Sequence, residues 1–410
     1  MSEMSYLEKL LDGVEVEWQT LGKVLKRTKG TKITAGQMKA LHKDNAPLKI
    51  FAGGKTVAFV DFKDIPEKDI NREPSIIVKS RGIIEFEYYD KPFSHKNEMW
   101  SYHSNNDAIS IKYIYYFLKI NEGYFQKIGG KMQMPQIATP DTDKFEVPIP
   151  CPDNPEKSLA IQSEIVRILD KFTALTAELT AELTMRKNQY NYYRDQLLSF
   201  DEGEVEWKTL GAIGKFTYGY AAKAQISGDA RFVRITDINT NGKLSPFEPM
   251  FVDISAENEK YTLKKNDLLM ARTGATFGKT MIFEEDYPAI YAGFLIKLSL
   301  DRDIIDPKYY WHFAQSDYFW EQANKLVSGG GQPQFNANAL KQIKVPIPYP
   351  NEAGKSLSEQ ARIVSVLDKF DILASSITEG LPREIELRQK QYEYYRDLLF
   401  SFPKPEIASH

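Results

Sequence analysis

The chain repeats part of itself, and the repeated pieces follow the same order in both halves. The three pairs, called anchors below, are VEWQTLG at Val16–Gly22 with VEWKTLG at Val205–Gly211, VPIPCPDNPEKSLAIQSEIVRILDKF at Val147–Phe172 with VPIPYPNEAGKSLSEQARIVSVLDKF at Val345–Phe370, and RKNQYNYYRDQLLSF at Arg186–Phe200 with RQKQYEYYRDLLFSF at Arg388–Phe402. Between the anchors the two halves look unrelated. A shared frame with two different inserts predicts two recognition modules held in a pseudo-symmetric arrangement.

The composition limits the class of protein. A chain of 410 residues is long enough for two or three domains with cores of their own. The single cysteine, Cys151, excludes a disulfide framework and suits a reducing compartment. The first residues, MSEMSYLEKLLDG, lack the features of a signal peptide, and no apolar run is long enough to cross a bilayer. We therefore expect a cytoplasmic protein.

The distribution of charge says more than the net charge of −3. Every charged residue from Lys23 to Lys43 is basic, and the matching stretch of the second half carries Lys215, Lys223, Arg231 and Arg234 against only Asp229. One such run is usually just a solvated face. Two runs at matching places in a repeat favour a surface that faces phosphates.

Each half is expected to fold as a strand-rich domain followed by helices. Short β-branched or aromatic runs bounded by Gly and Pro predict strands at 47–54, 55–62, 74–82, 231–239, 267–274, 280–285 and 292–300. Helices are predicted at 111–125 and 307–326, each followed by a Gly-rich turn, 128–136 and 328–336. The fold class is thus α+β, with two globular domains separated by two long helices and related by a pseudo-two-fold repeat.

Long helices are the clearest structural prediction. Apolar residues recur at alternating steps of three and four, as in Ile363, Leu367 and Phe370, which predicts an antiparallel coiled coil between the two long helices. About 40 residues of helix would span roughly 60 Å. Ser356, three residues before Glu359, has the spacing of a capping box, and Gly380 with Pro382 predicts a kink.

The first long helix contains a smaller repeat, TAEL at Thr176–Leu179 and again at Thr180–Leu183. This could simply be a stretch of good helix formers. It could also be a spacer whose length is set in units of four residues. Each unit adds roughly 6 Å of helix, which approaches two base-pair steps of about 3.4 Å.

These residues resemble a known family. Two variable regions alternate with helices introduced by VPIP and S-L-x-x-Q-x-x-I-V-x-x-L-D-K-F, as in the DNA-specificity (S) subunit of a type I restriction–modification enzyme. The TAEL repeats resemble those of the type IC class. The resemblance, which covers about Val14 to Phe402, implies two target recognition domains, each reading half of a split site in double-stranded DNA. It also implies helices that set the gap between half-sites.

The same resemblance implies the partners. Two methyltransferase (M) subunits, which bind S-adenosylmethionine and methylate adenine, would dock on the helices. Motor-nuclease (R) subunits, which use ATP and Mg, would complete the restriction complex. The chain itself would have no catalytic site, cofactor or metal. The expected segments are residues 1–152 and 201–350 for the recognition domains, 153–200 and 351–402 for the helices, and 403–410 for a tail.

Candidate DNA-binding residues fall into two groups. Basic side chains give affinity through phosphates; we predict this role for Lys26, Arg27, Lys29, Lys32, Lys215, Lys223 and Lys279. Arg and Gln on loops match the edges of guanine and adenine; the candidates are Arg81, Gln133, Gln136, Arg272, Thr273, Gln332 and Gln334. Tyr218 and Tyr220 are predicted to stack or wedge at the DNA surface. The Gly-rich turns could instead merely close each domain.

Tyrosines near the ends of both long helices predict a docking surface. Three tyrosines within four residues cover more than one helix face, so at least one in each cluster should point away from the partner helix. The predicted subunit-docking residues are Tyr192, Tyr193, Arg194, Tyr394, Tyr395 and Arg396. Plain packing of these rings is the alternative.

Two other motifs do not meet the requirements of the sites that they resemble. GATFGKT at Gly274–Thr280 has three residues between its glycine and GK, where a P-loop needs four. Glu206-Trp207-Lys208 could belong to a metal-dependent nuclease, but the other copy, Glu17-Trp18-Gln19, lacks the lysine. The alternative to a specificity subunit is a coiled-coil scaffold that binds two protein partners. That alternative leaves the matched basic stretches unexplained.

Overall fold

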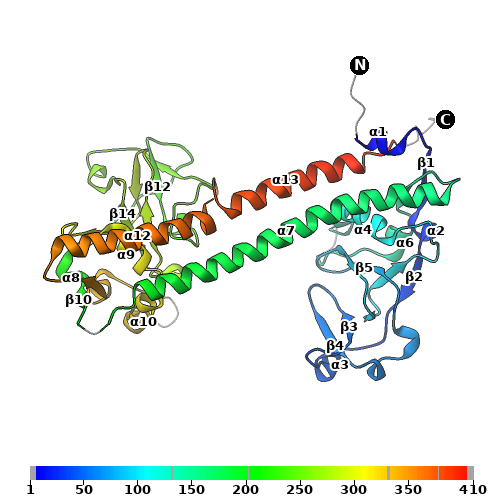
Figure 1. Cartoon of the computed structure of the whole chain (residues 1–410), viewed down its shortest axis with the longest axis horizontal. Coiled ribbons are helices and arrows are strands. Elements are labelled where there is room, and N and C mark those ends of the chain that lie inside the picture. The colour runs from blue at the N-terminus through cyan, green and yellow to red at the C-terminus, as the bar shows by residue number, and fades with distance from the viewer. Residues whose placement is uncertain (1–5, 131–132, 202, 330–332, 377, 404–410) are drawn as a thin grey trace, which may run out of the picture. The chain divides into compact units, whose positions relative to one another are not determined.

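A computed structural model describes residues 6–130, 133–201, 203–329, 333–376 and 378–403. It divides into two compact units, which Figure 1 shows in ribbon form. The first unit comprises residues 1–177 and 387–410, and the second comprises residues 178–386. Both divisions fall inside long helices, so the five predicted segments stay a prediction. No helix in the described part of the chain is long and apolar enough to cross a membrane.

The first unit mixes short strands with short helices. Its strands are β1 (Val16–Thr20), β2 (Lys26–Lys29), β3 (Leu48–Phe51), β4 (Val57–Val60), β5 (Ser75–Lys79), β6 (Glu85–Tyr89), β7 (Phe93–His95), β8 (Trp100–His103) and β9 (Glu146–Pro150). Its short helices are α1 (Tyr6–Leu11), α2 (Leu21–Val24), α3 (Ala35–Leu41), α4 (Ile111–Ile120), α5 (Glu122–Gly129) and α6 (Thr139–Asp143). The sheets have the orders β1-β9, β2-β8-β5-β6 and β4-β3-β7.

The second unit repeats this plan. Its strands are β10 (Val205–Thr209), β11 (Gly214–Tyr218), β12 (Ala230–Val233), β13 (Phe251–Val252), β14 (Asp267–Ala271), β15 (Thr280–Phe283), β16 (Ala289–Tyr291), β17 (Leu295–Leu300) and β18 (Lys344–Pro348). Its short helices are α8 (Leu210–Ile213), α9 (Pro307–Phe313), α10 (Asp317–Leu326) and α11 (Ala337–Leu340). The sheet orders β10-β18, β11-β17-β14-β15 and β13-β12-β16 match those of the first unit strand for strand.

The anchor strands close each unit in the same register. In the first unit Trp18 lies opposite Pro148, and in the second Trp207 lies opposite Pro346. Proline cannot donate a hydrogen bond to a ladder, so the VPIP segment suits a two-stranded ribbon with a free edge. The two anchor sequences therefore pair with each other, although more than 100 residues separate them in the chain.

The two helical predictions inside the domains were wrong about continuity. Each predicted helix is two helices, α4 with α5 and α9 with α10. Ser316 separates the second pair because its side chain accepts a hydrogen bond from the backbone N–H of Phe319 and starts a new helix. Asn121 is the junction of the first pair, and the side-chain amide of Asn121 donates to Phe117 O at 2.8 Å.

The long helices are α7 (Pro155–Leu197), α12 (Ala353–Ser375) and α13 (Leu381–Leu399), so the second long helix is interrupted where Gly380 and Pro382 lie. Helix α7 contributes its beginning to the first unit and its end to the second. In the second unit the Tyr193 ring stacks on Phe370 with centroids 5.3 Å apart. In the first unit the Tyr395 ring stacks on Phe172 at 5.5 Å. The predicted helix pairing and fold class are confirmed.

One detail of the helix prediction was wrong. Helix α12 begins at Ala353, so Ser356 lies inside the helix and is not the cap. Its hydroxyl instead accepts a hydrogen bond from Gln360. The apolar residues Ile363 and Leu367 pack into the core of the second unit with Trp311, in a cluster that also contains Tyr190 of α7.

Candidate DNA interface

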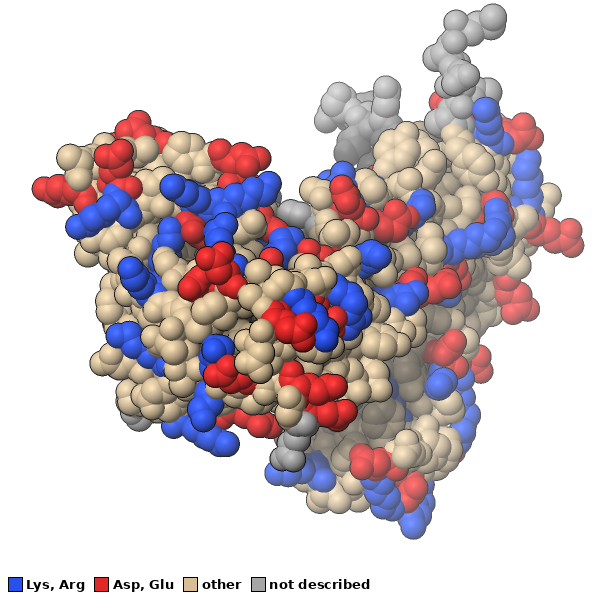
Figure 2. All heavy atoms as spheres, turned by 60° about the vertical axis from the view of Figure 1, so that its left-hand side comes forward, with Lys and Arg blue, Asp and Glu red and all other residues tan. Residues whose placement is uncertain are grey.

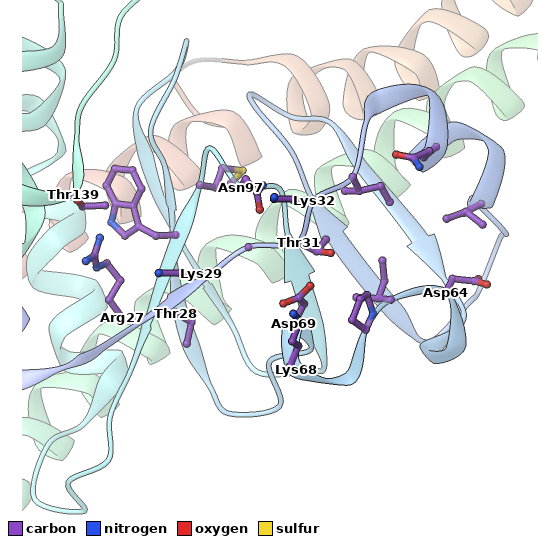
Figure 3. A pocket seen from close by; sticks show the side chains of 18 residues that line it. Arg27, Thr28, Lys29, Thr31, Lys32, Asp64, Lys68, Asp69, Asn97 and Thr139 are labelled. Carbon is purple, nitrogen blue, oxygen red and sulfur yellow. The ribbon is translucent and has the colours of Figure 1, made fainter.

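The basic stretch of the first unit lines a cleft of about 740 Å³. Strand β2 lies at the edge of its sheet and places Arg27 and Lys29 on exposed positions, and Lys32 follows in the next turn. Figure 3 shows Arg27 and Thr139 at one end of this cleft and Asp64 at the other, with Lys29 and Lys32 between them. The cleft thus joins the β2 sheet to the smaller lobe that carries α3.

A glycine shapes the turn between these two lysines. A Cβ at Gly30 would lie 2.4 Å from the carbonyl oxygens of His95 and Lys96, so no other residue fits there without movement. His95 is fully buried, and burial lowers the pKa of its imidazole, which keeps the ring neutral at pH 7. The buried His95 under Gly30 therefore adds no positive charge, and the charged residues that line the cleft are Arg27, Lys29, Lys32 and Lys68 with Asp64 and Asp69.

The cations of this stretch differ in availability. The guanidinium of Arg27 lies 3.6 Å from the Asp143 carboxylate, which partly neutralises it. Within the described residues, neither Lys29 nor Lys32 has an acidic side chain within ion-pair distance. Lys26 is exposed on the same strand. An exposed amine without a counter-charge attracts a phosphate more strongly than a paired one, which ranks Lys29 and Lys32 first.

The Gly-rich turns of both units pair with the turn after the central strand. In the first unit Gly82 N donates to Pro135 O at 2.9 Å, and Arg81 pairs with Gln136. In the second unit Gly274 N donates to Pro333 O at 3.0 Å, and Thr273 pairs with Gln334. Both glycines, Gly82 and Gly274, adopt positive φ angles of 75° and 69°.

This pairing brings predicted base-reading residues together in each unit. Arg81 and Gln136 are exposed side by side, and Gln133 is exposed nearby on the same turn. Thr273 is only 5% exposed, so its side chain offers little surface to a base, whereas Gln334 is half-buried. The predicted Gln332 lies outside the described residues. In this register Arg81 of the first unit corresponds to Thr273 of the second. Ser80 of the first unit corresponds to Arg272 of the second.

The remaining predicted residues of the second unit do not form one surface. Lys215 is exposed on β11 and Lys223 on the loop that follows, whereas Lys279 is half-buried in a different cleft of about 550 Å³ beside α7. Tyr218 is 43% exposed and its hydroxyl accepts a hydrogen bond from Ala337 N. Tyr220 packs against Tyr261 with ring centroids 5.6 Å apart, which leaves less of its ring for stacking.

Two arginines of the basic stretch in the second half form ion pairs inside the protein. Arg231 is buried, and both Arg231 and Arg234 form ion pairs with Asp237 at 3.3 and 2.9 Å. The interpretation of these two as phosphate-facing was wrong, because Asp237 lies beyond the stretch in sequence but folds back onto it. The face shown in Figure 2 likewise carries Lys and Arg interspersed with Asp and Glu.

The two motifs that the sequence analysis rejected have ordinary structural roles. Lys279 is followed directly by strand β15, so GATFGKT does not lead into a helix as a P-loop would. Trp207 packs against Tyr318, with ring centroids 6.2 Å apart. The residues that the structure describes contain no group of three or more His, Cys, Asp or Glu side chains able to hold a metal ion.

Comparison with known proteins now identifies the family. The model of the type I restriction modification DNA specificity domain matches residues 15–185 and again residues 203–387. The chain belongs to the type I restriction–modification specificity family. The Escherichia coli type I restriction enzyme EcoR124I/EcoR124II specificity subunit is 42% identical over the full length of both chains. The E. coli EcoprrI specificity subunit is 35% identical and covers 92% of this chain and 93% of its own length.

Solved structures agree on the fold. The S subunit of a type I restriction–modification system from M. genitalium superposes with a TM-score of 0.60 at 16% identity, covering 96% of this chain and 98% of that one. This specificity subunit is accordingly the non-catalytic component of such a system, which confirms the prediction made from the repeated anchors.

The predicted docking tyrosines of the specificity subunit divide into packed and exposed rings. Tyr193 and Tyr395 stack on the phenylalanines of the partner helices and are still 44% and 41% exposed, whereas Tyr192 and Tyr394 are 61% and 65% exposed. Each exposed ring makes an edge-to-face contact with its neighbour, with centroids 5.3 Å apart in both copies. The two units thus present the same aromatic pair, and Tyr192 and Tyr394 are the rings that solvent reaches most.

The two docking arginines differ. Arg194 is 5% exposed, and its guanidinium contacts Asp195 and Asn191 within the second unit, so little of it is left for a partner. The side chain of Arg396 is 26% exposed and pairs with Asp397 at 2.7 Å. The docking role of both residues stays a prediction, with Arg396 the better placed.

Sequence reasoning missed a pair of buried glutamines that attach the long helices to the recognition domains. Gln162 on α7 accepts from Ser110 N at 2.9 Å and donates to Ala108 O at 3.0 Å. Gln360 on α12 accepts from Asp306 N at 2.8 Å and donates to Ile304 O at 3.0 Å. Both glutamines are fully buried. The S-L-x-x-Q part of the anchor contained this signal, because the glutamine recurs unchanged in both copies.

An aspartate of the L-D-K-F part makes a second attachment, and here the two units differ. Asp170 accepts from Tyr116 at 2.5 Å and pairs with Lys112 at 2.7 Å. Asp368 bonds to His312 at 2.9 Å and pairs with Lys308 at 2.8 Å. Burial alone would raise the pKa of Asp368, but the bonds from His312 and Lys308 hold it at about 2.

His312 links three elements of the second unit. Its ring lies on α9, bonds to Asp368 of α12, and bonds through Nδ1 to the hydroxyl of Tyr190 of α7 at 2.9 Å. The ring is fully buried, and burial lowers the pKa of His312 despite the neighbouring carboxylate. A neutral ring with an ionised Asp368 requires Nε2–H to donate to Asp368 and Nδ1 to accept from Tyr190.

Proposed function

We propose that this specificity subunit recognises a bipartite target in double-stranded DNA, each of its two recognition domains reading one half-site. The observation that carries the proposal is the shared topology of two inserts that differ in sequence. The same strand orders and anchor registers occur in both units. One scaffold with two different surfaces is what a reader of two different half-sites requires.

The proposed modules follow the anchors. Residues 1–152 and 201–350 form the recognition domains, residues 153–200 and 351–402 form the spacer helices, and residues 403–410 form a tail. In the first domain the phosphate contacts come from Lys26, Arg27, Lys29 and Lys32, and the base contacts from the turn that carries Arg81 and Gln136. In the second domain Lys215 and Lys223 contact phosphates, and Arg272 and Gln334 face the bases.

The helices are proposed to set the gap between half-sites and to dock two methyltransferase subunits. The support for docking is the repeated aromatic pair, in which Tyr192 and Tyr394 are the more exposed ring of each unit. Tyrosines that are apolar on their faces and polar at their tips are frequent anchors of protein interfaces. Motor-nuclease subunits complete the restriction complex. S-adenosylmethionine binds the methyltransferase partners, and ATP with Mg binds the motor-nuclease partner in the cytoplasm.

Co-expression with candidate adenine methyltransferase subunits tests this function. The complex is purified, and methylated adenines are mapped genome-wide with and without this chain. Two half-motifs at a constant gap, methylated only when the chain is present, are the expected result. Methylation that is independent of the chain, or the lack of a stable complex, would favour a protein-binding scaffold instead.

A paired substitution tests the docking surface separately. Tyr192→Ala and Tyr394→Ala remove the exposed rings and leave the stacked Tyr193 and Tyr395 in place. We expect the double variant to bind DNA with unchanged salt dependence and to lose its methyltransferase subunits during gel filtration. Retention of both subunits would place the docking surface elsewhere.

A further inference from the structure

Arg272 is held more tightly than an ordinary loop arginine. Its backbone N–H donates to Phe294 O at 3.1 Å, and its carbonyl accepts from Phe335 N at 2.8 Å. The first bond ties the residue to the turn between β16 and β17, and the second ties it to the Gly-rich turn. Gly274, two residues on, has a positive φ that turns the chain away immediately afterwards. The Cα position of Arg272 is therefore fixed from both sides.

The side chain of Arg272 is fixed as well. Its guanidinium carbon lies 5.3 Å from the centre of the Tyr218 ring and 5.4 Å from that of Phe294, so both rings flank the planar group. Its Nε donates to Gly293 O at 3.2 Å. Tyr218 is itself held, since its hydroxyl accepts from Ala337 N at 3.1 Å. Few rotamers of Arg272 satisfy all three contacts.

The outer edge of this guanidinium is unused. Within the described parts of the chain, no hydrogen bond or ion pair involves the two terminal nitrogens of Arg272. The flanking rings are open to solvent, with Tyr218 43% and Phe294 57% exposed. An arginine that is held by its Nε and its faces presents two parallel N–H groups, which match two adjacent acceptors on a ligand.

The first unit has no such oriented arginine at the equivalent position. Ser80 occupies the place of Arg272, because Ile137 N bonds to Ser80 O as Phe335 N bonds to Arg272 O. Ser80 is 2% exposed, and its hydroxyl donates to Glu98 O at 2.7 Å. The scaffold of the turn therefore does not need an arginine here. The arginine belongs to what distinguishes the second domain from the first.

We propose that Arg272 reads one guanine of the second half-site through the O6 and N7 atoms of that base. The inference rests on the proposed function, because it presumes that the second domain faces DNA. Guanine is the base that offers two adjacent acceptors in the major groove, and a bidentate arginine is the usual partner for them. Because the two terminal N–H groups of Arg272 are oriented before binding, the side chain loses little conformational freedom when it binds the base.

The test uses the full chain in complex with its methyltransferase subunits, after the methylated motif has been mapped. Duplexes carry 7-deazaguanine, which lacks the N7 acceptor, at one guanine of the second half-site at a time. We expect one position at which this change weakens binding by about tenfold to a hundredfold for the wild type, the range of a good bidentate contact. Arg272→Ala should reduce that sensitivity below about threefold.

An exposed arginine of the same unit serves as the control. Arg302→Ala removes an exposed arginine from the turn after β17 in the same unit, and should keep the full 7-deazaguanine effect. Wild-type hydrogen exchange in peptides of the second unit shows that an Arg272 variant is folded. Equal weakening of specific and non-specific duplexes by Arg272→Ala would make Arg272 a phosphate contact and overturn the proposal. A second half-site without guanine on either strand would also overturn it.

Failure of the proposed function looks different. In that case the chain confers no bipartite methylation at all, and no half-site exists to probe. A normal bipartite motif, with 7-deazaguanine effects that are the same for wild type and Arg272→Ala, overturns only the assignment of Arg272.

Discussion

Replacing Lys29 and Lys32 by glutamine should weaken DNA binding in a way that depends on salt. These exposed lysines line the cleft of the first unit and have no acidic partner among the described residues. A lysine that neutralises one phosphate releases counterions and contributes about 0.9 to the slope of log K against log salt. Loss of both lysines should therefore lower that slope by about 1.8.

The slope fixes the size of the effect at each salt concentration. If the electrostatic contribution vanishes near 1 M salt, each contact is worth about fivefold in affinity at 0.15 M and about fifteenfold at 0.05 M. The double variant should then bind roughly 30-fold more weakly at 0.15 M and roughly 200-fold more weakly at 0.05 M. The preferred sequence should not change, because phosphates carry no sequence information.

Fluorescence anisotropy of the complex on a labelled duplex, titrated from 0.05 to 0.4 M salt, measures this slope. The control replaces Lys55 and Lys127, which are exposed on the first unit outside the cleft, by glutamine. A control that loses as much slope as the test pair would show a diffuse effect of net charge. An equal loss of affinity at every salt concentration in the test pair would refute the phosphate contacts.

Three further predictions concern the helices and their attachment. Deletion of the second TAEL, residues 180–183, shortens α7 by about 6 Å, so the gap in the mapped methylation motif should shrink by one or two base pairs; an unchanged gap would refute the spacer. Gln360→Ala leaves a buried N–H and a buried carbonyl without partners, which should cost about 3 kcal/mol of stability in the second unit, with Gln162→Ala giving the same loss in the first. Hydrogen exchange resolved by peptide locates each loss, and a loss spread evenly over both units would contradict the attachment. Because the folded pKa of His312 is depressed, protons bind the unfolded state more readily, so stability should fall by about 1 kcal/mol as the pH drops from 7 to 5.5; His312→Gln cannot titrate, and an equal fall in melting temperature for that variant would exclude His312 as the cause.

Local patterns in the sequence predicted the long helices and seven of the strands, but missed others such as β2, β8 and β11. The short β-branched runs became β3, β4, β5, β12, β14, β15 and β17, and the repeated anchors paired with each other. The breaks at Asn121 and Ser316 were missed because a single polar residue inside an apolar helical pattern gives a weak signal. Ser356 was misassigned because a serine followed by a glutamate three residues later also occurs inside helices.

The shared topology of the inserts could not be predicted from sequence. Strand order depends on pairing between distant segments, such as β2 with β8, and no local pattern encodes it. The candidate site suffered from the same limit. Arg231 and Arg234 looked free until the fold brought Asp237 to them. The aromatic flanks of Arg272 come from residues 54 positions before it and 22 positions after it in the chain.

The closure of each unit by its own anchor strands has a genetic consequence. The variable insert of each recognition domain lies between one VEW strand and the next VPIP strand, and the hydrogen bonds that close the domain are made by those strands themselves. A recombination event that crosses over in the DNA encoding two anchors would therefore deliver a complete, sealed domain into an unchanged helical frame. Because the two copies of each anchor are similar in sequence, such exchange could also occur within one gene. Under the proposed function, such an exchange would change one half-site in a single step and would leave the proposed methyltransferase-docking helices as they are.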